Sequence, residues 1–508
     1  MAFHLRWLDL AALFIILGSG FLVYSPHVLH PGPYMDPGAG KLIHHSLGYY
    51  PYPLHIDGWQ HLAQARQILE EGFTDRNPQF QEYVYHSSRE RGFHVILAAI
   101  TLLPGISLMG MSSFLPAVFF MMTALLVYLY FRDVLRKPEG GLFSIVLLAF
   151  MPSNANILGN WFLIPLNLWL FLFMGHLLIF HRVRDVRWRW GGIILVLIAS
   201  YLIYPFATLF ILLHLGIHGL RLLWERRQDL SQPVRVSLFV GPVVLALLAL
   251  SQKHALSQLL FRQGWTAVEY HYLLPDLLHP VFIFFGLLGL WLLYRKDTLF
   301  SLLGWTFSLF AIVSTYTYLS QRFTLLVPYQ RLLFFWQAIL ILGAGYGLAW
   351  SIQRLQGWSF LSGIFGRMRS QLVTSVLAII VLLVIFLSLF PGYYIAKPDR
   401  FSVQKAMGAD EKILLSEAQQ QGRVMLADPF LSATIYPMTG MKAAATISAN
   451  LDGRDQALYG KFMRADCSGR SSLLRKYDVD HVLSRRSISC PGMVLVDRAG
   501  GSRLYEVR

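Results

Sequence analysis

Charged residues are scarce in this sequence. Asp, Glu, Lys and Arg make up 14% of its 508 residues, whereas 55% are hydrophobic and the mean hydropathy is +0.49. A soluble globular chain of this size carries a larger charged share. The composition therefore excludes a soluble protein and predicts a polytopic α-helical membrane protein.

Acidic residues are the scarcer of the charged ones. The chain has 28 Asp and Glu against 43 Lys and Arg, which gives a formal net charge of +15 and a pI near 9.7. The basic residues gather in short loops between apolar segments, where they orient a membrane protein and contact anionic lipid. We therefore predict a membrane-lipid partner and no nucleic-acid partner.

Cysteine is almost absent. The two cysteines of the chain, Cys467 and Cys490, both lie in its soluble-looking tail. An even count in an exported domain favours a disulfide, and two buried thiols are the alternative. Two thiols without nearby histidines make a poor zinc cage. We expect no metal site in the tail.

Long apolar runs recur, and a helix needs about 20 residues to cross roughly 30 Å of hydrocarbon. We predict about 11–13 transmembrane helices. The clearest runs lie at 8–24, 113–131, 141–157, 161–180, 191–204, 206–223, 235–252, 281–294, 298–318, 332–350 and 371–391. The run 93–108 is also apolar, but Pro104 and Gly105 interrupt it. It is either a further crossing or a re-entrant segment.

The distribution of Lys and Arg favours the re-entrant alternative. If 93–108 does not cross and the N-terminus is cytoplasmic, all the basic loops fall on the cytoplasmic side, as the positive-inside rule requires. These loops lie near 132–137, 182–189, 221–235, 295–296 and 354–369. We therefore predict an integral protein of the cell membrane with a cytoplasmic N-terminus and an extracytoplasmic C-terminus. No small-residue cleavage site follows the first span, which is expected to be an anchor.

Three segments are then expected outside the membrane: a large first loop over 25–112, a loop over 253–280, and the tail. The chain divides into a transmembrane domain over 1–394 and a small soluble α/β domain over 395–508. In the tail, 423–427 and 481–483 are predicted to be strands and 472–476 a helix, and 493–496 with 504–507 a hairpin.

The first outer loop holds the most informative polar residues. Asp57 precedes an amphipathic stretch, 58–71, that closes on Gly72. Asp57 and His61 are four residues apart and share one helical face, while His55 lies just before the helix. The three could bind a divalent ion or form a base with orienting partners. The alternative, which spacing alone favours, is that Asp57 caps the helix and the histidines are ordinary loop residues.

Two further features lie on the same outer side. The polar turn 152–161 contains Asn154, Asn156 and Asn160 and ends at Trp161. Its amides could bind sugar hydroxyls, or they could satisfy backbone groups of a turn. Arg331, with Arg322 nearby, stands at the mouth of the span 332–350. An arginine there can pair with phosphate or can simply extend to the membrane interface.

In this order, these features resemble the catalytic subunit of oligosaccharyltransferase and, more widely, the GT-C glycosyltransferases that use polyprenyl-linked sugars. The segment IDGWQHLAQARQILEEG (56–72) is similar to the family's helix after the first span. The segment MPSNANILGNWFLIPLNL (151–168) is similar to its second motif. Arg331 precedes Gly343-Ala344-Gly345-Tyr346 as a phosphate-contacting arginine does in the family, and LLRKYDVDHVL (473–483) resembles the exported domains. The resemblance covers almost the whole chain.

Two departures from the family stand out. Phe162 and Ile164 occupy the positions of two acids of the second motif, so half of the family's metal site is missing. The tail contains no Trp-Trp-Asp-Tyr-Gly motif, which in the family helps to bind the acceptor sequon. The resemblance therefore does not extend to protein N-glycosylation.

The resemblance implies an enzyme that transfers a sugar or glycan, with inversion, from a polyprenyl-(pyro)phosphate-linked donor to a glycan or protein acceptor on the outer face. Asp57 would be the base, with His55 or His61 orienting it, and Arg331 and Arg322 would hold the donor phosphate. Substrate contacts are expected from Trp59, Asn154, Asn156, Asn160 and Trp161. This scheme needs no cofactor; a divalent cation such as Mg²⁺ or Mn²⁺ would bind Asp57, His55 and His61.

Two alternatives remain open. A degenerate relative would bind or move lipid-linked glycans, or assist a partner complex, without turnover. A metal-dependent hydrolase built on the first-loop histidines is disfavoured because no second acid or histidine cluster occurs on another span. In the transferase scheme, the C-terminal tail is expected to cap the mouth of the active-site cavity and to help choose the acceptor.

Overall fold

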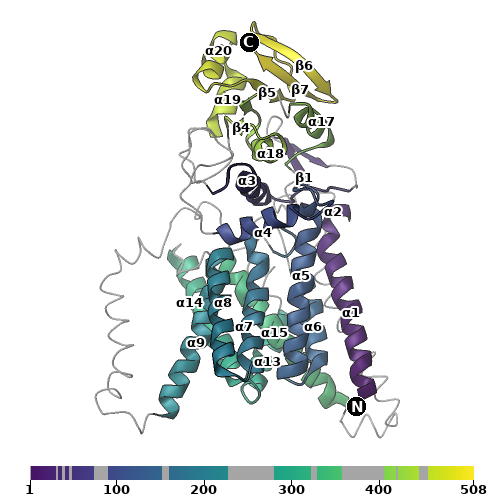
Figure 1. Cartoon of the computed structure of the whole chain (residues 1–508), viewed down its shortest axis with the longest axis vertical. Coiled ribbons are helices and arrows are strands. Elements are labelled where there is room, and N and C mark those ends of the chain that lie inside the picture. The colour runs from purple at the N-terminus through teal and green to yellow at the C-terminus, as the bar shows by residue number, and fades with distance from the viewer. Residues whose placement is uncertain are drawn as a thin grey trace, which may run out of the picture.

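The computed structural model describes residues 2–29, 33–36, 41–44, 49–73, 90–151, 159–226, 280–321, 329–356, 406–418, 422–445 and 456–508. A bundle of roughly parallel helices forms the lower part of the molecule, and a smaller domain containing the C-terminus stands above it (Figure 1). Short helices of the first loop lie between the two parts.

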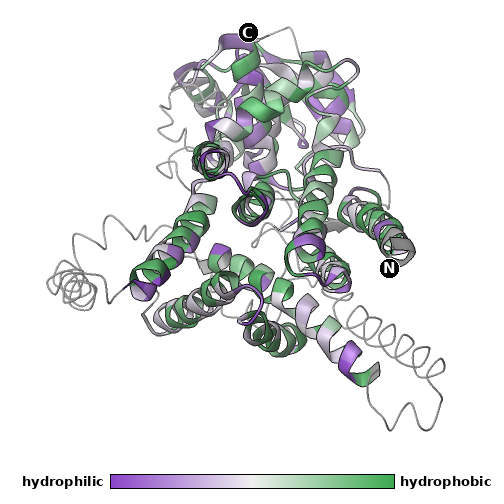
Figure 2. Cartoon of the chain, turned by 60° about the horizontal axis from the view of Figure 1, so that its bottom comes forward, coloured by the Kyte–Doolittle hydropathy of each residue, from purple (hydrophilic) through white to green (hydrophobic). Residues whose placement is uncertain are grey.

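Six of the described helices are long and apolar enough to cross a membrane. They are α1 (Ala2–Tyr24), α5 (Met111–Leu129), α8 (Val186–Ile203), α9 (Pro205–Glu225), α14 (Thr298–Gln321) and α15 (Tyr329–Gln356). Each falls on a predicted span, and hydrophobic residues dominate the bundle (Figure 2). A π-helical turn, η1 (Tyr130–Val134), continues α5.

Two apolar helices are shorter than the spans predicted for them: α6 (Pro138–Ala149) and α7 (Trp169–Arg182). A third, α13 (Pro280–Leu293), has the length of its predicted span and lies one residue earlier. The span expected at 161–180 differs most. Its first residues form irregular chain and a 3-10 turn, η2 (Pro165–Leu168), and helix α7 begins only at Trp169. Pro165 donates no backbone hydrogen bond, which favours a helix start here over a helix interior. The spans expected at 235–252 and 371–391 lie outside the described residues.

The ambiguous run 93–108 begins with helix α4 (Arg91–Thr101). Its 11 residues make it about 16 Å long, roughly half the thickness of the hydrocarbon layer. The chain then turns through Gly105, whose φ of 80° is a conformation that glycine adopts freely. In Figure 1, α4 lies across the top of the bundle. A short helix followed by a turn agrees with the re-entrant alternative that the charge distribution favoured.

The apolar stretch of helix α15 is completely buried. Glycines allow it to approach α13 closely: a Cβ added to Gly286 would lie 2.7 Å from the Leu340 carbonyl oxygen, and one on Gly289 would collide with the backbone of Gly343. Packing of this kind holds α15 firmly in place. Arg331, near the N-terminal end of α15, is therefore attached to a rigid element.

The first loop contributes α2 (Pro26–Leu29), the antiparallel strands β1 (Pro33–Asp36) and β2 (Lys41–His44), and α3 (Ile56–Glu71). Helix α3 packs against α4 and beneath the upper domain. The prediction of a helix over 58–71 that ends at Gly72 is confirmed, with a start two residues earlier.

The upper domain is a five-stranded sheet with helices on both faces. In chain order its elements are α17 (Ala409–Ala418), β3 (Val424–Leu426), α18 (Pro429–Thr439), β4 (Lys442–Ala443), α19 (Gln456–Arg464), α20 (Cys467–Lys476), β5 (His481–Ser484), β6 (Met493–Ala499) and β7 (Ser502–Val507). The strand order is β4-β3-β5-β7-β6, with β3 parallel to β4 and β5 and the last three strands antiparallel. The predicted small α/β domain is confirmed. The boundary expected at 394 lies outside the described residues.

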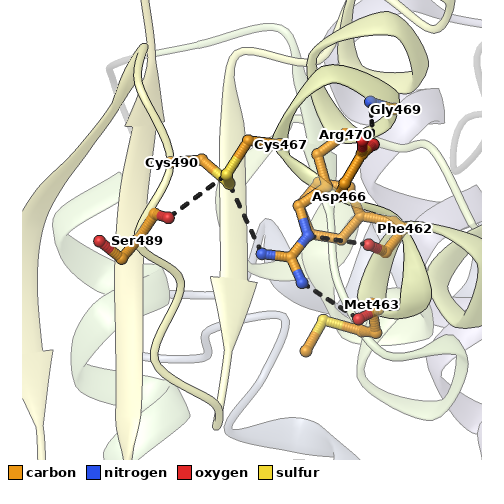
Figure 3. The surroundings of a disulfide bond; sticks show 8 residues. All are labelled: Phe462, Met463, Asp466, Cys467, Gly469, Arg470, Ser489 and Cys490. Carbon is orange, nitrogen blue, oxygen red and sulfur yellow. Dashed lines mark hydrogen bonds between the residues drawn. A yellow bond between two sulfur atoms is a disulfide. The ribbon is translucent and has the colours of Figure 1, made fainter.

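A disulfide joins Cys467, at the start of α20, to Cys490, in the segment before β6 (Figure 3). Arg470 of α20 donates hydrogen bonds to the backbone oxygens of Phe462 and Met463, both at 3.1 Å. Asp466 caps α20 by accepting from the Gly469 amide at 2.8 Å. The disulfide and these contacts tie α20 to α19 and to the β6–β7 hairpin.

The upper domain grips α3 through Arg66. The Arg66 guanidinium donates to the backbone oxygens of Tyr436 (3.2 Å) and Pro437 (3.0 Å) in the last turn of α18. The Tyr436 oxygen also accepts from the Gly440 amide at 2.9 Å, as is usual where a helix ends. Arg66 also pairs with Glu70 at 2.6 Å, and the Tyr436 hydroxyl donates to Glu70 at 3.3 Å. Arg66 follows Asp57 by nine residues and so lies on the opposite face of α3. One face of the helix is held by the upper domain, and the other presents Asp57.

Candidate active site

Asp57 does not cap α3. The N-cap is His55, whose Nδ1 accepts a hydrogen bond from the Asp57 amide at 3.1 Å. The interpretation of Asp57 as a capping residue is therefore wrong. Its carboxylate is 34% exposed, and its nearest described partner is the same His55 nitrogen at 3.6 Å. A carboxylate in the first turn of a helix is stabilised by the helix dipole and remains free for other contacts.

The segment before α7 closes one side of this helix start. The ring of Phe162 meets the ring of His55 edge-on, with centroids 5.7 Å apart. Phe162 and Ile164 are buried, at 0% and 2% exposure. The two positions where the family has acids are thus filled by apolar packing next to His55. The residues present do not fit the metal half-site of the second motif.

A different acid approaches from α4. Glu90 occupies the N-cap position of α4 without using its side chain as a cap, and His94 lies one turn further on. Ligand atoms of Glu90, His94 and His61 all lie within 4.8 Å of one another, and His61 Nδ1 is 3.0 Å from His94 Nε2. Two imidazoles and a carboxylate are a ligand set that zinc accepts. His61 therefore contacts His94, and the carboxylate of Asp57 lies outside this cluster.

Arg331 acts on the same group of residues. Its charge lowers the pKa values of His55, His61 and Glu90, in each case after the larger effect of burial. Asp57 in turn raises the pKa values of His55 and Glu90. Asp57 and Arg331, which are 274 positions apart in the sequence, thus both lie near His55 and Glu90. We call Asp57, Glu90, Arg331 and the histidines 55, 61 and 94 the outer site.

Burial dominates the protonation of the outer site. It raises the pKa of Glu90 to about 7 and lowers the pKa of His94 to about 4. The pKa of His61 is held well below its ordinary value by burial and by the neighbouring His94. At neutral pH the histidines are therefore neutral, and Glu90 is poised between its two protonation states.

The expected substrate-contacting residues are placed unevenly. Trp59 is fully buried and stacks on Tyr52, with ring centroids 5.8 Å apart. Trp161 is buried at 1% exposure, and Asn160 donates to the Leu148 oxygen at 3.0 Å, which is the turn-stabilising alternative. Asn154, Asn156 and Arg322 lie outside the described residues.

Sequence reasoning missed three members of this neighbourhood. Glu90 and His94 stood among the polar residues of the first loop, but nothing in the spacing linked them to His61. Tyr204, a buried residue between α8 and α9, gave no signal at all. A search for acids and histidines at helix starts would have found Glu90 and His94.

No protein-family model matches the sequence, and no curated protein matches it. Solved structures do. The oligosaccharyltransferase of Archaeoglobus fulgidus, tethered with an acceptor peptide, covers 93% of this chain and 69% of its own at a TM-score of 0.56 and 10% identity. ArnT from Cupriavidus metallidurans, bound to undecaprenyl phosphate, covers 97% of both chains at a TM-score of 0.54 and 11% identity. The archaeal enzyme has also been solved in complex with Zn and sulfate, at a TM-score of 0.53 and 12% identity over 92% of this chain and 67% of that one.

These similarities establish the fold. The chain is an integral membrane protein with the architecture of the GT-C membrane glycosyltransferases, as its sequence motifs predicted.

Proposed function

We propose that this protein is an inverting GT-C type glycosyltransferase that moves a sugar or glycan from a polyprenyl-phosphate-linked donor to an acceptor on the outer face of the membrane. The observation that carries the proposal is the convergence of Asp57 and Arg331 on one site through their common effect on His55 and Glu90. The solved neighbours support the donor class, since one holds a dolichol-phosphate and another undecaprenyl phosphate.

The chemistry needs little beyond positioning and charge. The acceptor oxygen bonds to the anomeric carbon of the donor sugar while the bond from that carbon to the phosphate oxygen breaks. The phosphate leaves with the electron pair, and the acceptor proton passes to the Asp57 carboxylate. Arg331 neutralises the charge that develops on the phosphate. His55 holds the start of α3, and with it Asp57, in place.

The orientation follows from the basic loops. With the N-terminus cytoplasmic, the outer site and the C-terminal domain both face the extracytoplasmic side, and the domain boundary near 394 precedes an exported tail. The acceptor is then a glycan or a protein on that side. The archaeal neighbour tethered with an acceptor peptide makes a peptide acceptor one case to test.

We further propose that His61, Glu90 and His94 hold a divalent cation of the zinc class, in place of the missing acids at Phe162 and Ile164. Bound there, the cation would supply positive charge beside the donor phosphate. The set Asp57, His55 and His61 expected from the sequence shares only His61 with it. Metal analysis of the purified protein tests this: His94→Ala should lose zinc and His218→Ala, in α9 away from the outer site, should retain it. Retention of zinc by both would reject the cluster.

Transfer from a radiolabelled lipid-linked sugar tests the enzyme assignment. We expect Asp57→Asn to lower kcat by about 10²–10⁴-fold and Arg331→Ala by about 10²–10³-fold. Matched controls are Glu71→Gln, at the exposed end of α3, and Arg354→Ala, at the opposite end of α15; both should keep wild-type activity. Full activity of the Asp57 and Arg331 variants would refute these roles.

The competing function is binding without turnover, and the packing of Phe162 and Ile164 in place of two acids favours it. A degenerate relative of this kind would bind or move lipid-linked glycans, or assist a partner complex. Purified protein that retains a polyprenyl-phosphate sugar but never releases free lipid phosphate would establish this alternative.

A further inference from the structure

Tyr204 occupies the single-residue corner between α8 and α9, on the side of the bundle where α4 lies. Helix α8 ends at Ile203, and α9 begins at Pro205. The residue before a proline is driven into extended conformation, and Tyr204 has φ −154° and ψ 95°. The local sequence therefore fixes this residue at the corner.

The ring of Tyr204 is well packed, but its hydroxyl is not satisfied. The side chain is buried at 4% exposure, and the ring lies 5.5 Å from Phe206 and 6.3 Å from Phe335 between centroids. The hydroxyl has no hydrogen-bond partner among the residues that the structure describes. Buried tyrosine hydroxyls almost always have a partner. Packing thus explains why the Tyr204 ring is buried, but it does not explain why a hydroxyl is present on that ring.

Two helices of the outer site flank Tyr204. Phe335, which the ring contacts, lies one turn after Arg331 on the same face of α15. On the other side, α4 meets the end of α8 so closely that a Cβ added to Gly92 would lie 2.9 Å from the Leu202 backbone. Glu90 is two residues before Gly92. The charges of Arg331 and Glu90 both reach Tyr204, whose pKa is raised mainly by burial. The group is therefore a neutral hydrogen-bond donor at neutral pH.

We propose that the Tyr204 hydroxyl donates a hydrogen bond to the phosphate of the donor lipid, beside Arg331. The inference rests on the proposed function and adds a ligand to it. A phosphate drawn to Arg331 offers oxygens that only accept, and a hydrogen bond to a charged acceptor is stronger than one between neutral groups. The unsatisfied hydroxyl is then preorganised for the ligand, because no internal partner has to be given up when the lipid binds.

Binding of undecaprenyl phosphate to the full-length protein in detergent tests the proposal. Tyr204→Phe removes only the hydroxyl and keeps the ring. We expect it to weaken binding about tenfold, the usual effect of losing a hydrogen bond to a charged group. The thermal stability of the lipid-free protein should not fall, since the lost oxygen had no internal partner. The matched control is Tyr201→Phe, one turn earlier on α8, where the side chain is 65% exposed; it should bind like the wild type.

The outcomes separate this inference from the proposed function. If Tyr204→Phe binds the lipid as tightly as the wild type while Arg331→Ala loses binding, Tyr204 is not a ligand and the transferase assignment stands. If the wild type binds neither undecaprenyl phosphate nor dolichol phosphate, the proposed function fails and the inference fails with it. Weaker binding by Tyr204→Phe together with unchanged stability supports the proposal.

Discussion

Within the outer site, burial moves the protonation of two neighbouring side chains in opposite directions. The pKa of Glu90 rises to about 7, and the pKa of His94 falls to about 4. The stability linked to Glu90 is fully present below its ordinary pKa and is lost as the pH rises through about 7. The stability linked to His94 is present above its ordinary pKa of 6.5 and is lost as the pH falls toward about 4. The two effects oppose each other in mildly acidic solution.

Glu90→Gln should reveal the pH dependence of stability that is linked to His94, because it removes the opposing contribution of Glu90. We expect the variant to lose stability more steeply than the wild type as the pH falls from 7 to 5, because the histidines still resist protonation while the compensating carboxyl is gone. The difference in slope is at most about 1.4 kcal/mol per pH unit for one proton. Thermal unfolding of the metal-free protein at several pH values measures it, with Glu71→Gln as the control. Parallel profiles for wild type and Glu90→Gln would contradict the assignment.

At this scale, single residues were only partly predictable. Asp57 was found because an acid after the first span is rare in a chain with so few charges. The capping of α3 by His55 could not be foreseen, because histidine is not a preferred N-cap and aspartate is. The contact between His61 and His94 spans 33 residues and depends on how α3 and α4 pack. Local spacing carries no information about such a contact.

Among the elements, α3 has the most specific placement. One face of α3 carries Asp57, a residue of the outer site. On the other face, Arg66 is bound by the last turn of α18. The bounds of α3 were predictable from its amphipathic pattern and Gly72. Its clamping by the C-terminal domain was not, because the partners are backbone oxygens that any sequence provides. The late start of α7 was missed for a different reason. A hydropathy window averages over Pro165 and so does not detect the residue at which the helix begins.

Arg66→Ala should therefore weaken two properties together. We expect lower thermal stability, by about 1.5–3 kcal/mol for lost hydrogen bonds from a charged donor, and lower kcat, because α3 is less firmly held behind Asp57. The KM for the lipid donor should change little. Arg66→Lys should not restore kcat, since an ammonium lacks the planar fork that reaches both carbonyls. The control is Arg464→Ala in α19. Normal kcat in Arg66→Ala would show that the clamp does not position the base.

For the whole molecule, composition and hydropathy were enough to predict the class. Long apolar runs report directly on insertion into lipid, and the distribution of basic loops was enough to predict that the run 93–108 is not a full span. The C-terminal α/β domain was also predictable, because alternating strands and a composition shift mark it. The burial of α15 and its close packing against α13 were not predictable, since they depend on glycine contacts between helices distant in sequence.

The placement of the cysteines tests the topology of the whole chain. We expect a membrane-impermeant thiol reagent to label Cys467 and Cys490 in intact cells only after reduction of their disulfide. Reduction should also lower the stability of the domain, by about 3 kcal/mol for a loop of 23 residues. Labelling that requires permeabilised cells would place the domain in the cytoplasm and overturn the proposed orientation.

The strand order of the upper sheet has a consequence for biosynthesis. Strand β7 is made after every other described strand, yet it lies inside the sheet, between β5 and β6. A chain released before β7 is translated possesses the described membrane helices and the outer-site residues but has no complete sheet behind α18. The hydrogen bonds between Arg66 of α3 and the last turn of α18 are then less firmly supported. A chain that lacks β7 should therefore hold α3, and with it Asp57, less firmly than the full-length chain.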